Sequence, residues 1–241
     1  MIRPEMIIFD YGNTIVKEKL DRIKGIEAVL LNAAVNPYNV TAEEISALVY
    51  ELKSDIGVYG RDIENYTMLE VHNHIFQRYL YEYFGIELTK SPEEVERIFE
   101  TAAFSGEPTK DIDKLLKYLD DKKIRSSVLS NISYSGSVLT RRINGYVPEH
   151  KFEFIIASSE YIFRKPHRRI FELALRKARL EPHKVWYCGD NAVFDVDGAS
   201  ACGIFPVWYK DAIDKPIEYI PKSDCLEVND WNELIEIIEK I

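Results

Sequence analysis

The chain has 241 residues, of which 46% are hydrophobic and 29% are charged, so it can bury a full core in one or two domains. Its formal net charge of −9 argues against a nucleic-acid groove or an anionic membrane surface as a partner, because both need a basic face. Any anion site must therefore be built locally, from backbone N–H groups, a metal ion or individual Lys and Arg side chains.

Five short runs of apolar, β-branched and aromatic residues predict β-strands. The runs are continuous rather than alternating, which indicates strands that are buried on both faces of a sheet. From Thr109 onward they alternate with helical patterns, and this alternation is typical of a parallel sheet covered by helices. The predicted strands span residues 6–9, 125–129, 154–157, 185–188 and 205–208, and the clearest helical patterns span 111–121 and 167–179.

The long segment between the first two predicted strands reads as helices and turns. Residues 66–84 carry apolar side chains on one broad helical stripe. Ser91-Pro92-Glu93-Glu94 provides an N-cap, a first-turn proline and an acidic first turn for a helix that runs to about residue 104. We therefore predict an all-helical cap domain over residues 17–105, inserted after the first strand of a core formed by residues 1–16 and 106–241.

Polar residues follow the predicted strands at the edge where a ligand would bind. In an open parallel sheet, ligands bind beyond the carboxyl ends of the strands. Asp10 follows the first strand, Ser130 the second and Lys165 the third, while Asp190 and Asp195 follow the fourth. An oxygen-rich cluster of acids suits Mg²⁺, which prefers a few carboxylates, retained waters and a substrate phosphate. A lysine and a serine opposite them would hold phosphate oxygens.

These residues fall in four short motifs, FDYGNT, LSN, RKPHRRIF and CGDNAVFDVDGA, which appear in this order along the chain. The motifs resemble those of the haloacid dehalogenase superfamily, whose members are mostly phosphatases with a Rossmann-like core and a mobile cap. The resemblance implies a three-layer α/β/α core with a parallel sheet, a Mg²⁺ cofactor and a small phosphorylated substrate. It covers most of residues 6–16 and 109–210, whereas residues 17–105 match only as a helical cap.

The resemblance implies a role for each residue that would meet the substrate. Asp10 would be the nucleophile, forming an aspartyl-phosphate that water then hydrolyses. Lys165 would neutralise charge between the nucleophile and the phosphate, and Ser130 would hydrogen-bond a phosphoryl oxygen. Thr14 would steady the loop after the nucleophile, and Asn131 would support the turn of the second motif, which completes the predicted substrate-binding set.

The first motif departs from the family pattern at one position. The usual pattern is D-x-D-G-T, in which the second aspartate protonates the leaving group and then activates the water. Here Gly12 replaces that aspartate. The family's metal also takes the backbone carbonyl of this position, so the implied metal site keeps Asp10, Gly12 and Asp190, with Asp195 beside them. Loss of a general acid/base typically costs about 10²- to 10⁴-fold in rate.

This loss leaves three possibilities for the reaction. The leaving group needs little proton assistance, as in a sugar-1-phosphate or an acyl phosphate; another residue acts as the base; or catalysis is weak. We expect His72 and His74 to be structural, because residues two apart on a helix do not share a face.

The leading hypothesis is a Mg²⁺-dependent phosphatase for a small phosphorylated metabolite, with sugar phosphates and acyl phosphates favoured. A regulatory protein that binds such a metabolite with little turnover is the alternative that Gly12 motivates. A 2-haloacid dehalogenase is disfavoured. The dehalogenases that this chain resembles carry a tyrosine two places after the nucleophile and need no metal. In this chain Tyr11 comes one place after Asp10, and Asp190 retains the metal position.

The cysteines and the N-terminal residues indicate in which cellular compartment the protein is expected. Cys188, Cys202 and Cys225 are widely spaced and form no C-x-x-C, so neither a disulfide framework nor a structural zinc site is expected. The first residues lack the layout of a signal peptide, and no apolar run is long enough to span a bilayer. We expect a cytoplasmic monomer or homodimer with no membrane or nucleic-acid partner.

Overall fold

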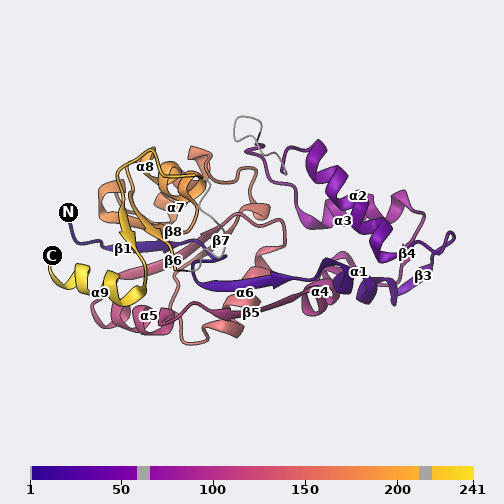
Figure 1. Cartoon of the computed structure of the whole chain (residues 1–241), viewed down its shortest axis with the longest axis horizontal. Helices are drawn as coiled ribbons and strands as arrows, with labels where there is room; N and C mark the ends of the chain where they lie inside the picture. The colour runs from indigo at the N-terminus through magenta and orange to yellow at the C-terminus, as the bar shows by residue number, and fades with distance from the viewer. Residues whose placement is uncertain (1, 59–65, 212–218) are drawn as a thin grey trace.

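The computed structural model describes residues 2–58, 66–211 and 219–241. Figure 1 shows an elongated molecule, with a sheet and its covering helices at one end and a group of helices at the other. Both chain termini lie at the sheet end. Within the described ranges, no helix is long and apolar enough to cross a membrane.

The core is a six-stranded sheet with the strand order β10-β9-β8-β1-β6-β7, and every pairing in it is parallel. All five predicted strands are present, with each boundary within one residue of its prediction. A sixth, β10, was not predicted because its sequence, Leu226-Glu227-Val228, contains a charged residue and forms no continuous apolar run. The strands are β1 (Met6–Phe9), β6 (Arg125–Ser130), β7 (Ile155–Ala157), β8 (Val185–Gly189), β9 (Phe205–Tyr209) and β10 (Leu226–Val228).

Helices cover both faces of this sheet, which confirms the predicted three-layer α/β/α core. Successive side chains of a strand point to opposite faces. Ile7 and Phe9 of β1 pack with α5 (Ile112–Asp121), α6 (Gly136–Tyr146) and α9 (Trp231–Glu239). Met6 and Ile8 pack on the other face with α7 (Arg168–Ala178) and α8 (Gly198–Ser200). Three short turns complete the core: η2 (Ser158–Glu160), η3 (Pro182–Lys184) and the π-helical η4 (Ala192–Asp197).

Four helices of the described residues lie between β2 and β5, within the segment for which the sequence predicted helices. They share an apolar cluster of their own, which includes Val29, Ile45 and Phe99. The segment also contains two antiparallel ribbons that the sequence analysis did not predict: β2 with β5, which leads the chain out of the core and back, and the shorter β3 with β4. The elements are β2 (Val16–Leu20), α1 (Arg22–Leu30), β3 (Ala33–Val35), α2 (Ala42–Asp55), α3 (Asn73–Tyr83), β4 (Glu87–Leu88), α4 (Pro92–Ala103) and β5 (Phe104–Pro108).

The helix predicted over residues 66–84 begins later than expected. His72 is the N-cap of α3, and the residues before it run along the loop that follows β7. There Leu69 forms a bridge with Phe163, and the N–H of Arg164 donates to the carbonyl of Met68 at 3.0 Å. This pairing competes with the helix for the same backbone groups, which sequence periodicity cannot reveal. By contrast, α4 begins at the predicted place, and Ser91 forms the expected N-cap.

Candidate active site

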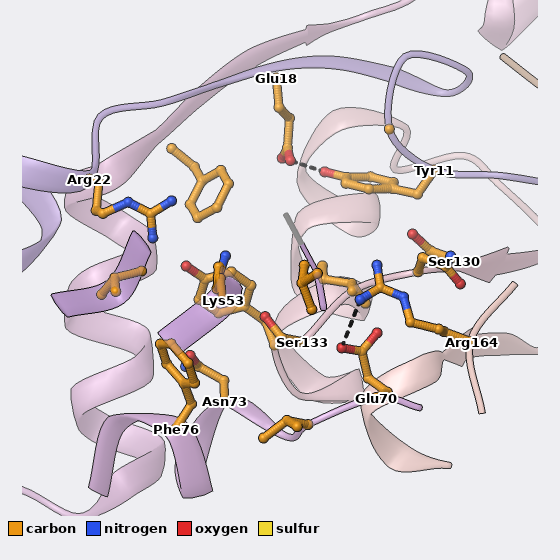
Figure 2. A pocket seen from close by; sticks show the side chains of 18 of the residues that line it. Tyr11, Glu18, Arg22, Lys53, Glu70, Asn73, Phe76, Ser130, Ser133 and Arg164 are labelled. Atoms are coloured by element: carbon orange, nitrogen blue, oxygen red, sulfur yellow. Dashed lines mark hydrogen bonds and ion pairs between the residues drawn. The ribbon is translucent and has the colours of Figure 1, made fainter. Parts of the chain in front are cut away.

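The carboxyl ends of β1, β6 and β8 meet at a cavity of about 460 Å³. Figure 2 shows side chains from the strand ends and from the helices after β1 pointing into this space. Of the predicted site residues, only Thr14 is absent from the cavity lining. The lining includes Asp10, Gly12, Ser130, Asn131, Lys165, Asp190 and Asp195.

Lys165 is the central cation of the site. Its Nζ donates hydrogen bonds to Asp10 Oδ1 at 2.8 Å and to Asp195 Oδ1 at 2.5 Å. A third bond, of 2.8 Å, runs to the hydroxyl of Tyr187, which in turn donates to the carbonyl of Leu129. Burial alone lowers the pKa of this ammonium, but the two carboxylates outweigh burial and raise it, so the lysine carries its charge at neutral pH.

Asn131 holds the backbone of this lysine in place. The N–H of Lys165 donates to Asn131 Oδ1 at 2.7 Å, and Asn131 Nδ2 donates to the carbonyl of Lys165 at 2.8 Å. The two bonds fix the loop after β7 against the end of β6. Ser130, just before this asparagine, is buried at the strand end and lines the cavity.

Three carboxylates converge beside the ammonium. One oxygen from each of Asp10, Asp190 and Asp195 lies within 4.8 Å of the others. Burial, followed by the repulsion of the other two carboxylates, raises the pKa of Asp190 to about 8. Burial also raises the pKa of Asp195, against the opposing effect of Lys165. Such a cluster of hard oxygen ligands holds more negative charge than one lysine balances, so it fits a divalent cation such as Mg²⁺.

Local packing fixes the two acids that follow β8. A Cβ on Gly189 would lie 2.3 Å from Asp195 Cγ, so this position requires glycine for the close approach of the carboxylate. The N–H of Asn191 donates to Asp195 Oδ2 at 2.9 Å. Trp208 Nε1 donates to the backbone carbonyl of Asp190 at 2.8 Å, which anchors the loop to β9.

The loop after the nucleophile has room at Gly12. A Cβ built there would meet no atom within 4 Å, so packing does not require glycine. Asn13 Nδ2 donates to Asp190 Oδ2 at 3.4 Å, which links this loop to the acids after β8. Thr14 is fully buried, and its carbonyl accepts a 2.8 Å bond from the Thr109 hydroxyl. This contact uses the backbone of Thr14, whereas its hydroxyl Oγ1 is buried without a hydrogen-bond partner among the described residues, so a loop-anchoring role for the side chain stays a prediction.

The family model of the haloacid dehalogenase-like hydrolases matches residues 7–208. The chain belongs to this family. Two curated relatives match parts of this haloacid dehalogenase-like hydrolase. The glyceraldehyde 3-phosphate phosphatase of Pyrococcus furiosus is 29% identical over 91 residues, which are 37% of this chain and 38% of the relative. The haloacid dehalogenase-like hydrolase domain-containing protein 3 of Homo sapiens is 34% identical over 125 residues, 43% of this chain and 47% of the relative. The matched segments therefore span less than half of either relative.

Solved structures of the family share the fold over the whole chain. A phosphatase from Thermococcus onnurineus has a TM-score of 0.63 at 17% identity, and covers 97% of each chain. A 2-haloacid dehalogenase from Pseudomonas syringae has a TM-score of 0.66 at 18% identity, with 100% of this hydrolase and 99% of the dehalogenase covered. Because phosphatases and dehalogenases share this fold, the likeness shows the architecture and not the reaction.

The sequence analysis missed the part of the hydrolase's cavity that the inserted helices form. Tyr11 donates a 2.5 Å bond to Glu18 Oε1 on β2, and Glu18 Oε2 lies 3.5 Å from Arg142 Nη1. Arg22 and Lys53 line the cavity from α1 and α2. Apart from Tyr11, which lies in the first motif, these residues belong to no motif. Helix packing rather than sequence spacing brings them together, so the sequence offered no signal for them.

The two histidines do not line the cavity, which agrees with the structural role expected of them. The reason given for that expectation was wrong, because His72 caps α3 instead of lying within it, and its ring lies 4.5 Å from that of His74. His74 Nε2 lies 3.2 Å from Glu96 Oε2, a buried carboxylate that also accepts from the Ser135 hydroxyl. These contacts join α3 and α4 to the start of α6.

Proposed function

We propose that this hydrolase is a Mg²⁺-dependent phosphatase that transfers the phosphoryl group of a small metabolite to Asp10 and then to water. The observation that carries the proposal is the contact of Lys165 Nζ with Asp10 and Asp195, beside Asp190 at the base of the cavity. The contact combines a carboxylate nucleophile, a lysine that its carboxylate neighbours keep protonated, and an acidic cluster that fits a hard metal ion.

The two chemical steps use the residues at the strand ends. Asp10 attacks phosphorus with a carboxylate oxygen, the bond from phosphorus to the leaving oxygen breaks, and its electron pair departs with that oxygen. Lys165 and the Ser130 hydroxyl stabilise the negative charge on the phosphoryl oxygens. Water then attacks the phosphorus of the aspartyl-phosphate, which releases inorganic phosphate and restores Asp10.

The acids would also hold the metal. Asp10, Asp190 and the carbonyl of Gly12 are the proposed ligands, with Asp195 as a neighbour that Lys165 and Asn191 orient. Bound Mg²⁺ would supply positive charge against the phosphoryl oxygens as they are transferred.

The missing acid/base restricts the substrates that we propose. Gly12 offers no proton to a departing oxygen, so leaving groups that are stable as anions, such as those of acyl phosphates and sugar-1-phosphates, are favoured. A relative named glyceraldehyde 3-phosphate phosphatase supports a small phosphorylated metabolite as the substrate. The free cysteines Cys188, Cys202 and Cys225 support a reducing, cytoplasmic setting.

We also propose that residues 17–105 act as a cap domain over a core of residues 1–16 and 106–241. The four inserted helices have their own apolar cluster, and the β2–β5 ribbon joins them to the core. Residues of the core and residues of the inserted segment line the cavity. Closure of the cap over the core would therefore exclude water from the phosphoryl group.

The test measures phosphate release from a panel of phosphorylated metabolites with Mg²⁺, with wild type and Asp10→Asn in parallel. We expect release by wild type, none above background by Asp10→Asn, and loss of wild-type activity in EDTA. Phosphate release that never exceeds the Asp10→Asn level would refute the proposal.

Gly12 favours a second candidate, a metabolite-binding regulatory protein with little turnover. Calorimetric binding of a metabolite that wild type does not hydrolyse would support this candidate. Halide release from a 2-haloacid in EDTA would instead support the third reaction, carbon–halogen hydrolysis.

A further inference from the structure

Besides Lys165 and Arg142, three cationic side chains line the cavity that holds the nucleophile. Arg22 is the first residue of α1, Lys53 lies in the last turn of α2, and Arg164 directly precedes Lys165. Figure 2 shows Arg22 and Lys53 on the side of the inserted helices, facing Arg164 and Ser130 across the cavity. Acidic side chains line the same cavity, and three of them, Asp10, Asp190 and Asp195, lie together at the strand ends, whereas Arg22 and Lys53 lie on the inserted helices.

The cations are close enough to affect one another. Burial lowers the pKa of Lys53 to about 8, and repulsion from Arg22 and Arg164 contributes to the shift. Glu70 opposes it, but that carboxylate already lies 3.5 Å from Arg164 Nη1 and accepts a 2.6 Å bond from the Ser158 hydroxyl. Positive side chains that lie near one another in a partly buried space attract an anionic ligand.

Arg22 and Lys53 are separate from the residues that would hold the transferred phosphoryl group. Asp10, Ser130 and Lys165 come from the strand-end side, whereas the two cations come from α1 and α2. The cavity of about 460 Å³ is within the usual size range for whole small-molecule ligands, about 300–1,000 Å³. A substrate bound at Asp10 therefore has room to extend toward Arg22 and Lys53.

We propose that the substrate carries a second anionic group, a carboxylate or a second phosphate, which binds at Arg22 and Lys53 while the transferred phosphoryl group lies at Asp10. The inference rests on the proposed phosphatase function and names the class of its substrate. Arginine binds carboxylates and phosphates in a planar, two-pronged geometry, and lysine adds a point charge, so the pair suits either anion.

The test compares matched substrates that differ in the second group. Glyceraldehyde 3-phosphate against 3-phosphoglycerate tests a carboxylate, and fructose 1-phosphate against fructose 1,6-bisphosphate tests a second phosphate. In at least one pair, we expect kcat/KM to be about 10- to 100-fold higher for the more anionic member, the effect of one or two charge-assisted hydrogen bonds.

Charge-removing variants connect this preference to the two residues. Arg22→Met and Lys53→Met should each lower the ratio of kcat/KM within the preferred pair by about 10-fold, and Lys53→Arg should restore it. Lys24→Met is the matched control, because it removes one exposed cation from the same helix as Arg22. Circular dichroism confirms that each variant is folded.

Binding to Asp10→Asn, measured by calorimetry, gives the same comparison without turnover. Equal affinity for both members of each pair, or a preference that Arg22→Met and Lys53→Met leave unchanged, would overturn the inference. Hydrolysis of the less anionic member of each pair would still uphold the phosphatase proposal in that case. Conversely, tight anion-dependent binding without any hydrolysis would support the anion site and refute the phosphatase.

Discussion

The ammonium group of Lys165 lies 2.8 Å from the carboxylate of Asp10, although 155 positions separate the two residues in the chain. The parallel sheet brings them together, because β1 is central and the loop carrying Lys165 follows β7, two strands away. Asn131, at the end of the strand between them, holds the lysine backbone by two hydrogen bonds. The cation therefore lies at Asp10, the proposed nucleophile, before any substrate binds.

Replacement of this lysine should affect both activity and stability. Lys165→Met removes the cation from three converging carboxylates, and loss of one partner of a buried ion pair typically costs about 3–5 kcal/mol. We expect phosphate release to be lost and the free energy of unfolding to fall in urea titrations. Lys184→Met is the control, since it breaks a half-exposed pair with Glu5, and it should change stability by less than about 1 kcal/mol. Equal destabilisation by the two variants would contradict this prediction.

The stability of the metal-free protein should fall as the pH rises. The folded-state pKa of Asp190 is raised from 3.8 to about 8, first by burial and then by repulsion from Asp195 and Asp10. Between these two values the folded protein binds more protons than the unfolded chain, so the free energy of unfolding decreases with increasing pH. Mg²⁺ competes with these protons, so the stabilisation that it adds should grow from pH 6 to pH 8.

Thermal unfolding in EDTA and in Mg²⁺, measured across this pH range, checks the expectation. Asp190→Asn cannot titrate, so it should flatten both the pH dependence in EDTA and the growth of the Mg²⁺ effect. A Tm in EDTA that rises from pH 6 to pH 8 in wild type would show that the sign is wrong.

The sequence predicted the core well because its signals were local. Continuous buried runs such as residues 6–9 have one stable arrangement in an α/β protein, and the motif residues follow directly from the strand ends. The prediction failed where tertiary contacts decided the structure. Residues 66–72 have helical periodicity, but they lie extended because they pair with the loop that precedes Lys165.

The site was predictable on its core side and not on its helical side. Asp10, Lys165 and Asp190 were expected from motifs, whereas Tyr187 reads in the sequence as one more apolar residue of a buried strand. Its hydroxyl became relevant only through its bond to Lys165. Arg22 belongs to a helix whose place beside the strand ends depends on packing, for which the sequence carries no pattern.

Gly189, which precedes the acids proposed to hold the metal, should not tolerate a side chain. A Cβ at Gly189 would lie 2.3 Å from Asp195 Cγ, and overpacking of this kind typically costs about 1–3 kcal/mol. Gly189→Ala should lower the melting temperature and weaken the binding of Mg²⁺, measured by calorimetry, because Asp195 must move. Gly145→Ala is the control, since a Cβ at that position meets nothing within 4 Å; because Gly145 lies in α6, alanine should not lower the melting temperature, and it should leave the binding of Mg²⁺ unchanged. Wild-type affinity for Mg²⁺ in Gly189→Ala would show that the position of Asp195 does not matter to the metal.

Gly12→Asp should instead be tolerated and should change which substrates react. The position lines the cavity, and a Cβ there meets no atom within 4 Å, so the first atom of an aspartate side chain is accommodated without a clash. It would supply a proton to the departing oxygen, a contribution of about 10²- to 10⁴-fold where the leaving group is a poor one. We expect the variant to accelerate hydrolysis of an alkyl phosphate far more than that of acetyl phosphate, whose leaving group needs no proton. Gly12→Asn fills the same space without the acid and should give no such gain. Equal acceleration of both substrates, or the same gain with Gly12→Asn, would mean that the missing aspartate does not limit this enzyme.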